Sequence, residues 1–247
     1  MSVKILGIIP ARFASTRFPG KVLADIRGKT MIQRVYEQAS LATSLTKVIV
    51  ATDDARVEEE AAKFGAKVIM TKTDHPSGTD RCQEAYQKMG EEFDFVINIQ
   101  GDEPFIKPEQ IDALSSCLSK DSELATLIKK IDTEDILWNT GNVKVVFNTH
   151  MEALYFSRQT IPFLRGVDKK EWLNRFPFYE HVGLYAYRVD ILEKVCALPP
   201  SHLEEAESLE QLRWLENGFK IKVQPTEWDS YCIETPEDLE NLLHYNN

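Results

Sequence analysis

The chain has 247 residues, of which 43% are hydrophobic and 28% are charged, a balance typical of a packed globular protein and too apolar for a disordered one. The formal net charge of −10 disfavours binding to nucleic acids and acidic membranes, because such binding depends on neutralising phosphates. No apolar run approaches the roughly 20 residues that cross a bilayer, and four widely spaced cysteines indicate neither a disulfide framework nor a zinc site. We therefore expect a cytoplasmic protein with reduced thiols and no membrane insertion.

The first half of the chain alternates apolar segments typical of buried strands with amphipathic segments typical of helices. Strands are expected over residues 5–9, 47–51, 67–70 and 93–99, and helices over residues 31–42, 54–64 and 79–89. This alternation predicts an α/β fold with a Rossmann-like, mostly parallel sheet flanked by helices. Ligands of such sheets bind beyond the carboxyl ends of the strands, so the loops that follow the strands are the first place to seek a site.

The second half has a less regular pattern. Strands are expected over residues 124–128, 143–147 and 181–187, and helices over residues 189–196 and 209–216. The stretch 163–178 mixes charges with aromatic residues and is interpreted as an excursion or an interaction surface. Thr235 and Pro236 are typical of a helix N-cap and first helical residue. No linker divides the chain, so we expect one α/β domain over residues 1–247. It would consist of two parts (1–120 and 121–230) and a final stretch that returns along the chain and ends in a helix (231–247).

The loop after the first strand is basic. Between residues 10 and 23 there is no acidic residue and there are three cations, which are Arg12, Arg17 and Lys21. Small residues such as Ser15 let the backbone approach a ligand, and the cations can face several phosphates. A P-loop is excluded because Val22 follows the lysine, and no GxGxxG order is present. We favour phosphate binding over the alternative of a basic surface loop on an acidic protein.

Polar residues also follow later strands. Asp102 comes after the fourth strand, where a carboxylate would face a Mg²⁺ ion bridging phosphate oxygens, although it could equally cap a turn. Ser77 and Gly78 open a helix whose amides could hold an anion, and simple capping is an equal alternative. Both loops follow predicted strands, so we expect them at the edge of the sheet where the basic loop begins.

Further candidates lie in the second half. Arg158 ends an apolar segment and could pair with a carboxylate. His181 is interpreted as a buried core histidine, with a ligand contact or a base as the alternatives. Glu210 and Gln211 lie on an amphipathic helix, whose default interpretation is a solvated face. Glu234 precedes a helix cap and by itself indicates nothing.

Seven motifs occur in an order that closely resembles the 3-deoxy-manno-octulosonate cytidylyltransferase (CMP-Kdo synthetase) family. They are Pro10-Ala11-Arg12 through Gly20-Lys21, Ala51-Thr52-Asp53-Asp54, Ser77-Gly78-Thr79-Asp80-Arg81, Asn98-Ile99-Gln100-Gly101-Asp102-Glu103-Pro104, Leu154-Tyr155-Phe156-Ser157-Arg158, His181-Val182-Gly183-Leu184-Tyr185 and Leu209-Glu210-Gln211-Leu212-Arg213. Each motif is weak alone, but the ordered set runs from about Ile5 to Leu239 and is specific.

The resemblance implies a nucleotide-diphospho-sugar transferase-like fold and a reaction. CTP and the acidic eight-carbon sugar Kdo give CMP-Kdo and diphosphate, which activates the sugar for lipopolysaccharide biosynthesis. It also implies a cytoplasmic homodimer, with residues 1–120 binding the nucleotide and residues 121–230 binding the sugar and forming the dimer. Two other classes are less favoured: an enzyme that uses a different acidic sugar or a nucleotide-sugar, and a non-catalytic nucleotide-binding protein.

The resemblance also implies roles for individual residues. Lys21, Arg12 and Asp102 would be catalytic, and the nucleotide would be bound by Arg12, Ser15, Lys21, Ser77, Gly78 and Arg81. The sugar would be surrounded by Gln100, Arg158, His181, Tyr185, Glu210 and Gln211. Asp102 would hold Mg²⁺, the expected cofactor.

One departure concerns the second metal carboxylate. The family usually has an aspartate where this chain has Glu234, which keeps the charge on a side chain one methylene longer. We expect Glu234 to be the second Mg²⁺ ligand. The alternatives are an altered metal site or a modified sugar such as the 8-amino analogue of Kdo.

Overall fold

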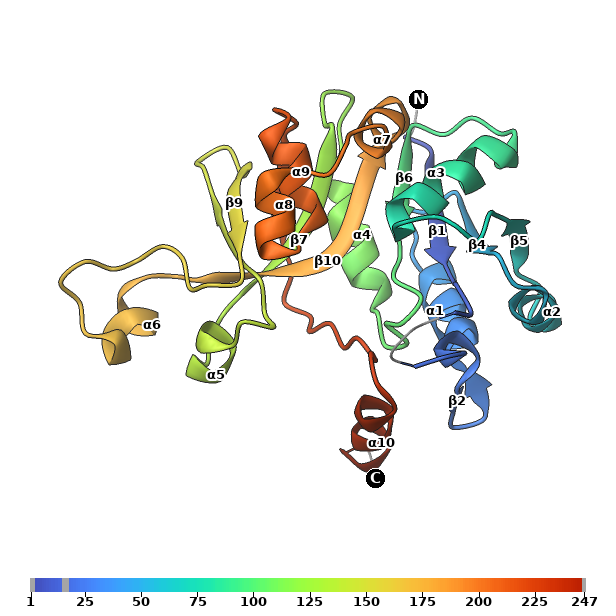
Figure 1. The fold of residues 1–247 in the computed structure, drawn as a ribbon, viewed down its shortest axis with the longest axis horizontal. Coiled ribbons are helices and arrows are strands. Elements are labelled where there is room, and N and C mark those ends of the chain that lie inside the picture. The colour runs from blue at the N-terminus through green and yellow to red at the C-terminus, as the bar shows by residue number, and fades with distance from the viewer. Residues whose placement is uncertain (1–2, 15–17, 246–247) are drawn as a thin grey trace.

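The computed structural model of the protein describes residues 3–14 and 18–245. Within these ranges a nine-stranded sheet forms the centre of the molecule, with helices on both faces (Figure 1). Its strands are β1 (Ile5–Pro10), β4 (Lys47–Thr52), β5 (Lys67–Met70), β6 (Phe95–Asn98), β7 (Leu124–Lys130), β8 (Lys144–Phe147), β9 (Ala153–Ser157), β10 (Tyr179–Arg188) and β11 (Ile221–Pro225). A two-stranded hairpin, β2 (Asp25–Ile26) and β3 (Lys29–Thr30), lies apart from it.

The helices cover the sheet and its edges. They are α1 (Met31–Ser40), α2 (Ala55–Lys63), α3 (Gly78–Met89), α4 (Pro108–Ser116), α5 (Glu134–Trp138), α6 (Trp172–Arg175), α7 (Val189–Cys196), α8 (His202–Glu207), α9 (Glu210–Glu216) and α10 (Pro236–Tyr245), with 3-10 turns η1 (Lys21–Leu23) and η2 (Lys169–Glu171). The elements expected from the sequence are present. The additional ones are β2, β3, β9, β11, α4, α5, α6, α8 and the two 3-10 turns. From the sequence, β9 is indicated only as an apolar segment before Arg158.

The sheet is mostly parallel, as expected. Its order is β11-β7-β10-β6-β1-β4-β5, and β8 and β9 extend it at β10. The pairs β1–β4, β1–β6, β4–β5 and β7–β11 are parallel, whereas β10 runs antiparallel to β6, β7 and β8. The carboxyl ends of β1, β4 and β6 therefore meet at one edge of the sheet, where the predicted site loops begin.

Two apolar cores lie on opposite faces of the sheet, because side chains alternate between the faces along each strand. On β1, Leu6 and Ile8 pack with α3, α7 and α9, whereas Ile5 and Ile9 pack with α1, α2 and α4. These β1 side chains are at most 4% exposed. The helices on both faces hold the strand ends rigidly, which fixes the starting points of the site loops.

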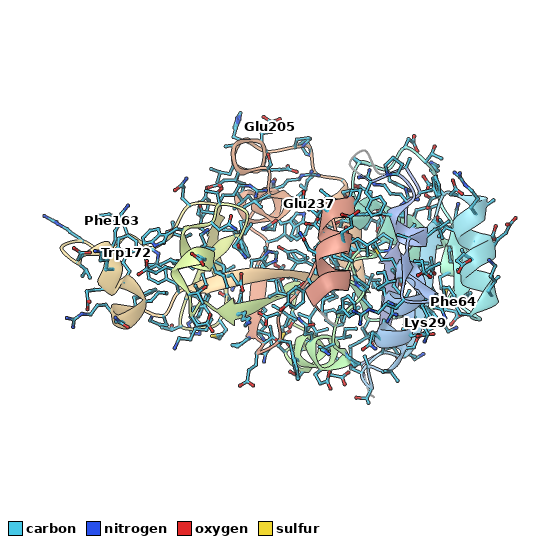
Figure 2. The ribbon with its side chains drawn as sticks, turned by 90° about the horizontal axis from the view of Figure 1, so that it is seen from below. Lys29, Phe64, Phe163, Trp172, Glu205 and Glu237 are labelled. Atoms are coloured by element: carbon cyan, nitrogen blue, oxygen red, sulfur yellow. The ribbon has the colours of Figure 1, made fainter. Side chains whose placement is uncertain are left out.

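An arm extends from the end of the sheet formed by β8, β9 and β10. It comprises residues 158–178 with α6, and Figure 2 shows Phe163 and Trp172 at its outer part. Trp172 stacks on Phe178 at 5.8 Å between ring centroids, and both belong to a small core of their own. Phe163 is 72% exposed. Of the aromatic residues in the expected excursion, Trp172 and Phe178 thus pack in a core, whereas Phe163 lies on the surface.

The chain returns to its first half at the end. Residues 226–235, which we call the return segment, lead from β11 to α10, drawn in dark red in Figure 1. Thr235 caps α10 as predicted: its hydroxyl accepts a hydrogen bond from the Asp238 amide (3.2 Å), and the Asp238 carboxylate accepts one from the Thr235 amide (2.8 Å). The expected boundaries at residues 120 and 230 stay a prediction. None of the helices in the described ranges has the length and apolar character needed to span a membrane.

Candidate active site

A polar pocket of about 240 Å³ lies where the carboxyl ends of β1 and β6 meet the start of α3. It is lined by Pro10, Arg12, Lys21, Val22, His75, Pro76, Ser77, Gly78, Arg81, Gln100, Gly101, Asp102 and Glu234. These residues come from four segments that are distant in sequence: the basic loop, the loop and first turn of α3, the loop after β6, and the return segment. The structure therefore brings together eight of the predicted site residues.

Lys21 and Asp102 form an ion pair in this pocket. Lys21 Nζ lies 2.5 Å from Asp102 Oδ2, and it also donates to the carbonyl oxygen of Ile233 at 3.3 Å. Their side chains are 15% and 22% exposed, so the pair is shielded but reachable by a ligand. The lysine reaches this place because Gly20, at a φ of +72°, turns the chain into η1. A cation and a carboxylate that share one site are what binding of a metal–triphosphate requires.

Gly101 brings the ends of β1 and β6 into contact below this pair. A Cβ atom at position 101 would lie 2.7 Å from the backbone oxygen of Pro10, so a side chain does not fit there. Gln100, one residue earlier, donates from Nε2 to the carbonyl oxygen of Gly183 at 3.3 Å. That carbonyl belongs to the irregular part of β10 between Val182 and Tyr185. Gln100 thus joins the pocket to the part of the molecule expected to bind the sugar.

The start of α3 forms another wall. Ser77 is the N-cap: its hydroxyl accepts from the Asp80 amide (3.2 Å) and donates to the Asp80 carboxylate (2.6 Å). Ser77 and Gly78 also line the pocket, so capping and a position at the pocket coexist. The free amides of this first turn and the positive end of the helix dipole suit an anion.

Arg81 supports the pocket from below its surface. It is 3% exposed, and its guanidinium donates to the Thr71 hydroxyl and the Lys72 carbonyl and lies 3.4 Å from Asp53 Oδ2. With these partners Arg81 fixes the loop between β5 and α3. Its predicted role as a nucleotide ligand stays a prediction, and the structure adds this positioning role.

His75 lines the pocket and was not among the predicted site residues. Its Nε2 is hydrogen-bonded to Glu84, which also accepts from the Lys72 amide (2.9 Å) and pairs with Lys88 (2.7 Å). Burial alone would raise the pKa of Glu84, but the hydrogen bonds from Lys88, Lys72 and His75 outweigh it and lower this pKa to about 2. The position of His75 in a loop after a strand was the available signal, since ligands gather there.

The residues expected around the sugar form a second, buried group beside β10 and α9. His181 Nε2 lies 3.0 Å from the Thr126 hydroxyl, and its ring packs edge-on against Phe156 and tilted against Tyr185. Burial lowers the pKa of His181 to about 3, so the ring is neutral near pH 7. This agrees with the interpretation of a buried histidine and leaves a contact with a ligand open as a prediction.

Glu210 and Gln211 are not on a solvated face, so the default interpretation of this helix was wrong. Gln211 is 5% exposed, and Glu210 accepts a hydrogen bond from the Thr79 hydroxyl at 2.8 Å, while burial raises the pKa of Glu210. The reason is that α9 packs against β9 and the core, which covers the polar side of this short helix as well. Tyr185 Oη and Gln211 Nε2 are buried with no hydrogen-bond partner among the described residues. Unpaired buried polar atoms of this kind suit a hydroxyl-rich ligand.

Arg158 lies outside the lining of the pocket. Its Nε donates to the Glu207 carbonyl at 2.7 Å, and its other nitrogens reach the carbonyls of Ser208 (3.3 Å) and Thr140 (3.4 Å). The guanidinium thus holds the end of α8, and its predicted contact with the sugar stays a prediction. Ser15, predicted to bind the nucleotide, lies outside the described residues, as does Arg17.

The residues present fit a magnesium ion. Asp102 and Glu234 line the same pocket, and within the described ranges no group of three or more His, Cys, Asp or Glu side chains gathers to hold a metal. Mg²⁺ is commonly bound by one or two carboxylates together with substrate phosphates and water, so two oxygen donors beside a phosphate site are a suitable set. Which residues hold the ion stays a prediction.

The fold and this pocket define a class: an α/β nucleotide-binding protein with the cationic and carboxylate groups of a nucleotidyltransferase. A model of the cytidylyltransferase family matches residues 6–221. The chain is 57% identical to the 3-deoxy-manno-octulosonate cytidylyltransferase of Cytophaga hutchinsonii and 55% identical to that of Parabacteroides distasonis, each over 98% of both chains. These matches and the ordered motifs agree over nearly the full length of the chain.

Solved structures agree with the sequences. A CMP:2-keto-3-deoxy-manno-octonic acid synthetase complexed with CTP superposes with a TM-score of 0.89 at 43% identity, over 98% of both chains. A 4-diphosphocytidyl-2C-methyl-D-erythritol synthase from Anaerococcus prevotii, at 12% identity and a TM-score of 0.65, shows that the fold alone is shared more widely. The chain belongs to the 3-deoxy-manno-octulosonate cytidylyltransferases of the cytidylyltransferase family, as the motifs predicted.

Proposed function

We propose that this protein transfers CMP from CTP to 3-deoxy-manno-octulosonate (Kdo), giving CMP-Kdo and diphosphate. The observation that carries the proposal is the Lys21–Asp102 pair, which stands at the strand ends in a pocket lined also by Arg12 and by the start of α3. Relatives named for this reaction match the chain along 98% of its length. Cytoplasmic location and use of the product in lipopolysaccharide biosynthesis belong to the same proposal.

The reaction requires positioning and charge stabilisation. The anomeric hydroxyl of Kdo attacks the α-phosphorus of CTP, so a new oxygen–phosphorus bond forms as the bond to the diphosphate breaks and the hydroxyl proton is released. Negative charge grows on the leaving oxygens, and Lys21 and Arg12, two of the cations that line the pocket, would stabilise it. Asp102 and Glu234 would hold Mg²⁺, which when bound supplies further charge neutralisation at the phosphate oxygens. The scheme includes no covalent enzyme intermediate, because the sugar hydroxyl attacks the α-phosphorus directly.

Diphosphate release tests the proposal. The purified protein is incubated with Kdo and, in separate reactions, with CTP, ATP, GTP or UTP, and CTP is then paired with the 8-amino analogue of Kdo. We expect rapid release of diphosphate only from the combination of CTP and Kdo. Equal turnover of the other nucleotides would contradict the assignment of CTP, and faster turnover of the amino sugar would contradict the assignment of Kdo.

The role of Glu234 has its own test. Glu234→Gln removes the charge while keeping the length of the side chain, so we expect the Mg²⁺ concentration for half-maximal activity to rise by about 10-fold, the order of one lost charge-assisted contact. Glu237→Gln is the matched control, since Glu237 is exposed in the first turn of α10 and does not line the pocket. An unchanged Mg²⁺ requirement in Glu234→Gln would reject Glu234 as a ligand.

A homodimer is part of the proposal. The support in the structure is the arm, where Phe163 presents a 72% exposed aromatic ring, and Leu154 on β9 is 60% exposed. Large exposed apolar side chains are common at interfaces between subunits. Light scattering of the purified protein should give twice the mass of the chain, and a monomer at micromolar concentration would contradict this part.

A further inference from the structure

The return segment crosses from the sugar side of the molecule to the pocket and is fixed at both ends. At its start the Thr226 amide donates to the Ile128 carbonyl at 2.8 Å, which continues the β7–β11 pairing. At its far end the Ile233 amide donates to the Asp102 carbonyl at 2.9 Å. The Ile233 side chain is 2% exposed and packs in a small apolar cluster with Ile26 and Met31.

Two of the groups around the ion pair therefore belong to this segment. The Ile233 carbonyl accepts a hydrogen bond from Lys21 Nζ at 3.3 Å, and the next residue, Glu234, lines the pocket. A shift of the segment by one residue or by a fraction of a turn would displace both groups. The pocket therefore depends on the register of the segment, that is, on which of its residues lies beside Lys21.

A buried carboxyl group, that of Glu103, contacts the middle of the segment. Glu103 is 6% exposed, and its Oε2 accepts a hydrogen bond of 2.6 Å from the Ser230 hydroxyl. Burying a carboxyl group costs free energy unless the group is hydrogen-bonded. The bond from Ser230 therefore offsets part of the cost of burying Glu103. Glu103 directly follows Asp102 but does not line the pocket. Its side chain is directed to the return segment, whereas that of Asp102 is directed to Lys21.

We propose that Glu103 and Ser230 are positioning residues whose hydrogen bond sets the return segment against the loop after β6, so that the Ile233 carbonyl and Glu234 stand beside Lys21 and Asp102. The two adjacent residues of this loop then have different roles. Asp102 faces the ligand site, and Glu103 fixes the segment that completes it. The inference rests on the proposed function for its effect on turnover, whereas its effect on the segment itself does not.

The test compares two serine-to-alanine variants that each remove a hydroxyl-to-carboxylate hydrogen bond of 2.6 Å. Ser230→Ala removes the bond to Glu103, and Ser44→Ala removes the bond to Asp112, which lies outside the pocket. The first readout is amide hydrogen exchange in the protein without ligands. A side-chain hydrogen bond typically contributes enough to change local opening up to about 10-fold, so we expect exchange at Ile233 to accelerate about 10-fold in Ser230→Ala.

The second readout is turnover. In Ser230→Ala we expect kcat to fall and the Mg²⁺ requirement to rise, each by about 5-fold, with a smaller change in KM for CTP, since the Arg12 and α3 walls are untouched. Ser230→Thr, which keeps the hydroxyl, should restore both readouts, and Glu103→Gln, which keeps an acceptor oxygen, should lie between. Ser44→Ala should leave Ile233 exchange and the Mg²⁺ requirement as in the wild type.

The outcomes separate the two proposals. If the amide of Ile233 exchanges at the same rate in Ser230→Ala as in the wild type, the positioning role is overturned, whatever the activity of the variant. Faster exchange with unchanged kcat and Mg²⁺ requirement would also overturn it, because the segment would then move without consequence for the site. If the wild-type protein releases no diphosphate from CTP with Kdo, the proposed function fails, and the exchange comparison still decides whether Glu103 and Ser230 hold the segment.

Discussion

The pocket at the strand ends and the buried group beside β10 use opposite means to present polar atoms. In the pocket, charged side chains on loops face an open space, and Lys21 and Asp102 compensate one another at 2.5 Å. In the buried group, His181 is neutral, and Tyr185 and Gln211 carry buried polar atoms without partners in the described chain. The difference teaches that charged groups near solvent are kept in place by pairing with one another, whereas polar groups inside the core stay neutral.

The largest effect should come from the charged region. Lys21→Met removes the cation beside Asp102, and loss of one preorganised charge-stabilising group typically lowers kcat about 100- to 1000-fold. Diphosphate release measures it, and Lys29→Met is the control, because Lys29 pairs with Glu37 on the surface at 2.5 Å. A Lys21→Met enzyme within about 3-fold of wild-type kcat, a change of under 1 kcal/mol, would remove charge stabilisation from the comparison.

A smaller effect is expected where a buried cation supports the pocket. Arg81→Lys keeps the charge but loses the planar fork that reaches Thr71, Lys72 and Asp53 together, so we expect about 2–3 kcal/mol less stability to urea unfolding. Arg56→Lys provides the comparison, since Arg56 is exposed and pairs with Asp54, and its cost should stay below about 0.5 kcal/mol. Equal losses in the two variants would show that burial of Arg81 has no special weight.

The buried neutral region should give a change of opposite sign in stability and in binding. Tyr185→Phe removes a hydroxyl that has no hydrogen-bond partner among the described residues, so unfolding stability should stay unchanged or rise by up to about 1 kcal/mol. If the Tyr185 hydroxyl forms a hydrogen bond with the sugar, KM for Kdo should rise about 5-fold in this variant, while KM for CTP is unchanged. Steady-state kinetics and urea unfolding decide it, and a destabilised variant with unchanged KM for Kdo would contradict the assignment.

The last prediction concerns the dependence of stability on pH. His181 is neutral in the folded protein down to a pKa of about 3, whereas in the unfolded chain it takes up a proton near its ordinary value of about 6.5. The unfolded state therefore binds more protons between these values, so stability present above pH 6.5 is lost as the pH falls. His181→Gln should show a shallower loss between pH 6.5 and 5, where Glu84 remains ionised in both states. If the free energy of unfolding falls with pH equally steeply in the two proteins, His181 is not a buried neutral histidine.

Much of the nucleotide region followed from the sequence, because parallel strands bring their carboxyl ends to one edge. That rule alone places Lys21 after β1 and Asp102 after β6 at a common site, although 81 residues separate them. The burial of Glu210 and Gln211 did not follow, because it depends on packing of α9 against β9. Periodicity describes one helix face at a time and does not report what a distant strand covers.

The supporting residues were less predictable still. His75 and Glu84 lie nine positions apart and meet only because the loop before α3 folds back along that helix. Ser230 reaches Glu103 from 127 residues away, and neither residue has a motif of its own. Such partners are specified by tertiary contacts rather than by local pattern, so only coordinates expose them.

The close approach of Pro10 and Gly101 has a consequence for redesign. Because a side chain at position 101 would collide with backbone rather than with a movable group, this part of the pocket offers no site for adjusting depth by substitution. Substitutions meant to change which ligand the pocket accepts should therefore be made in the wall formed by residues 75–78. We expect libraries that vary this wall to yield altered nucleotide preference, and libraries at position 101 to yield misfolded protein.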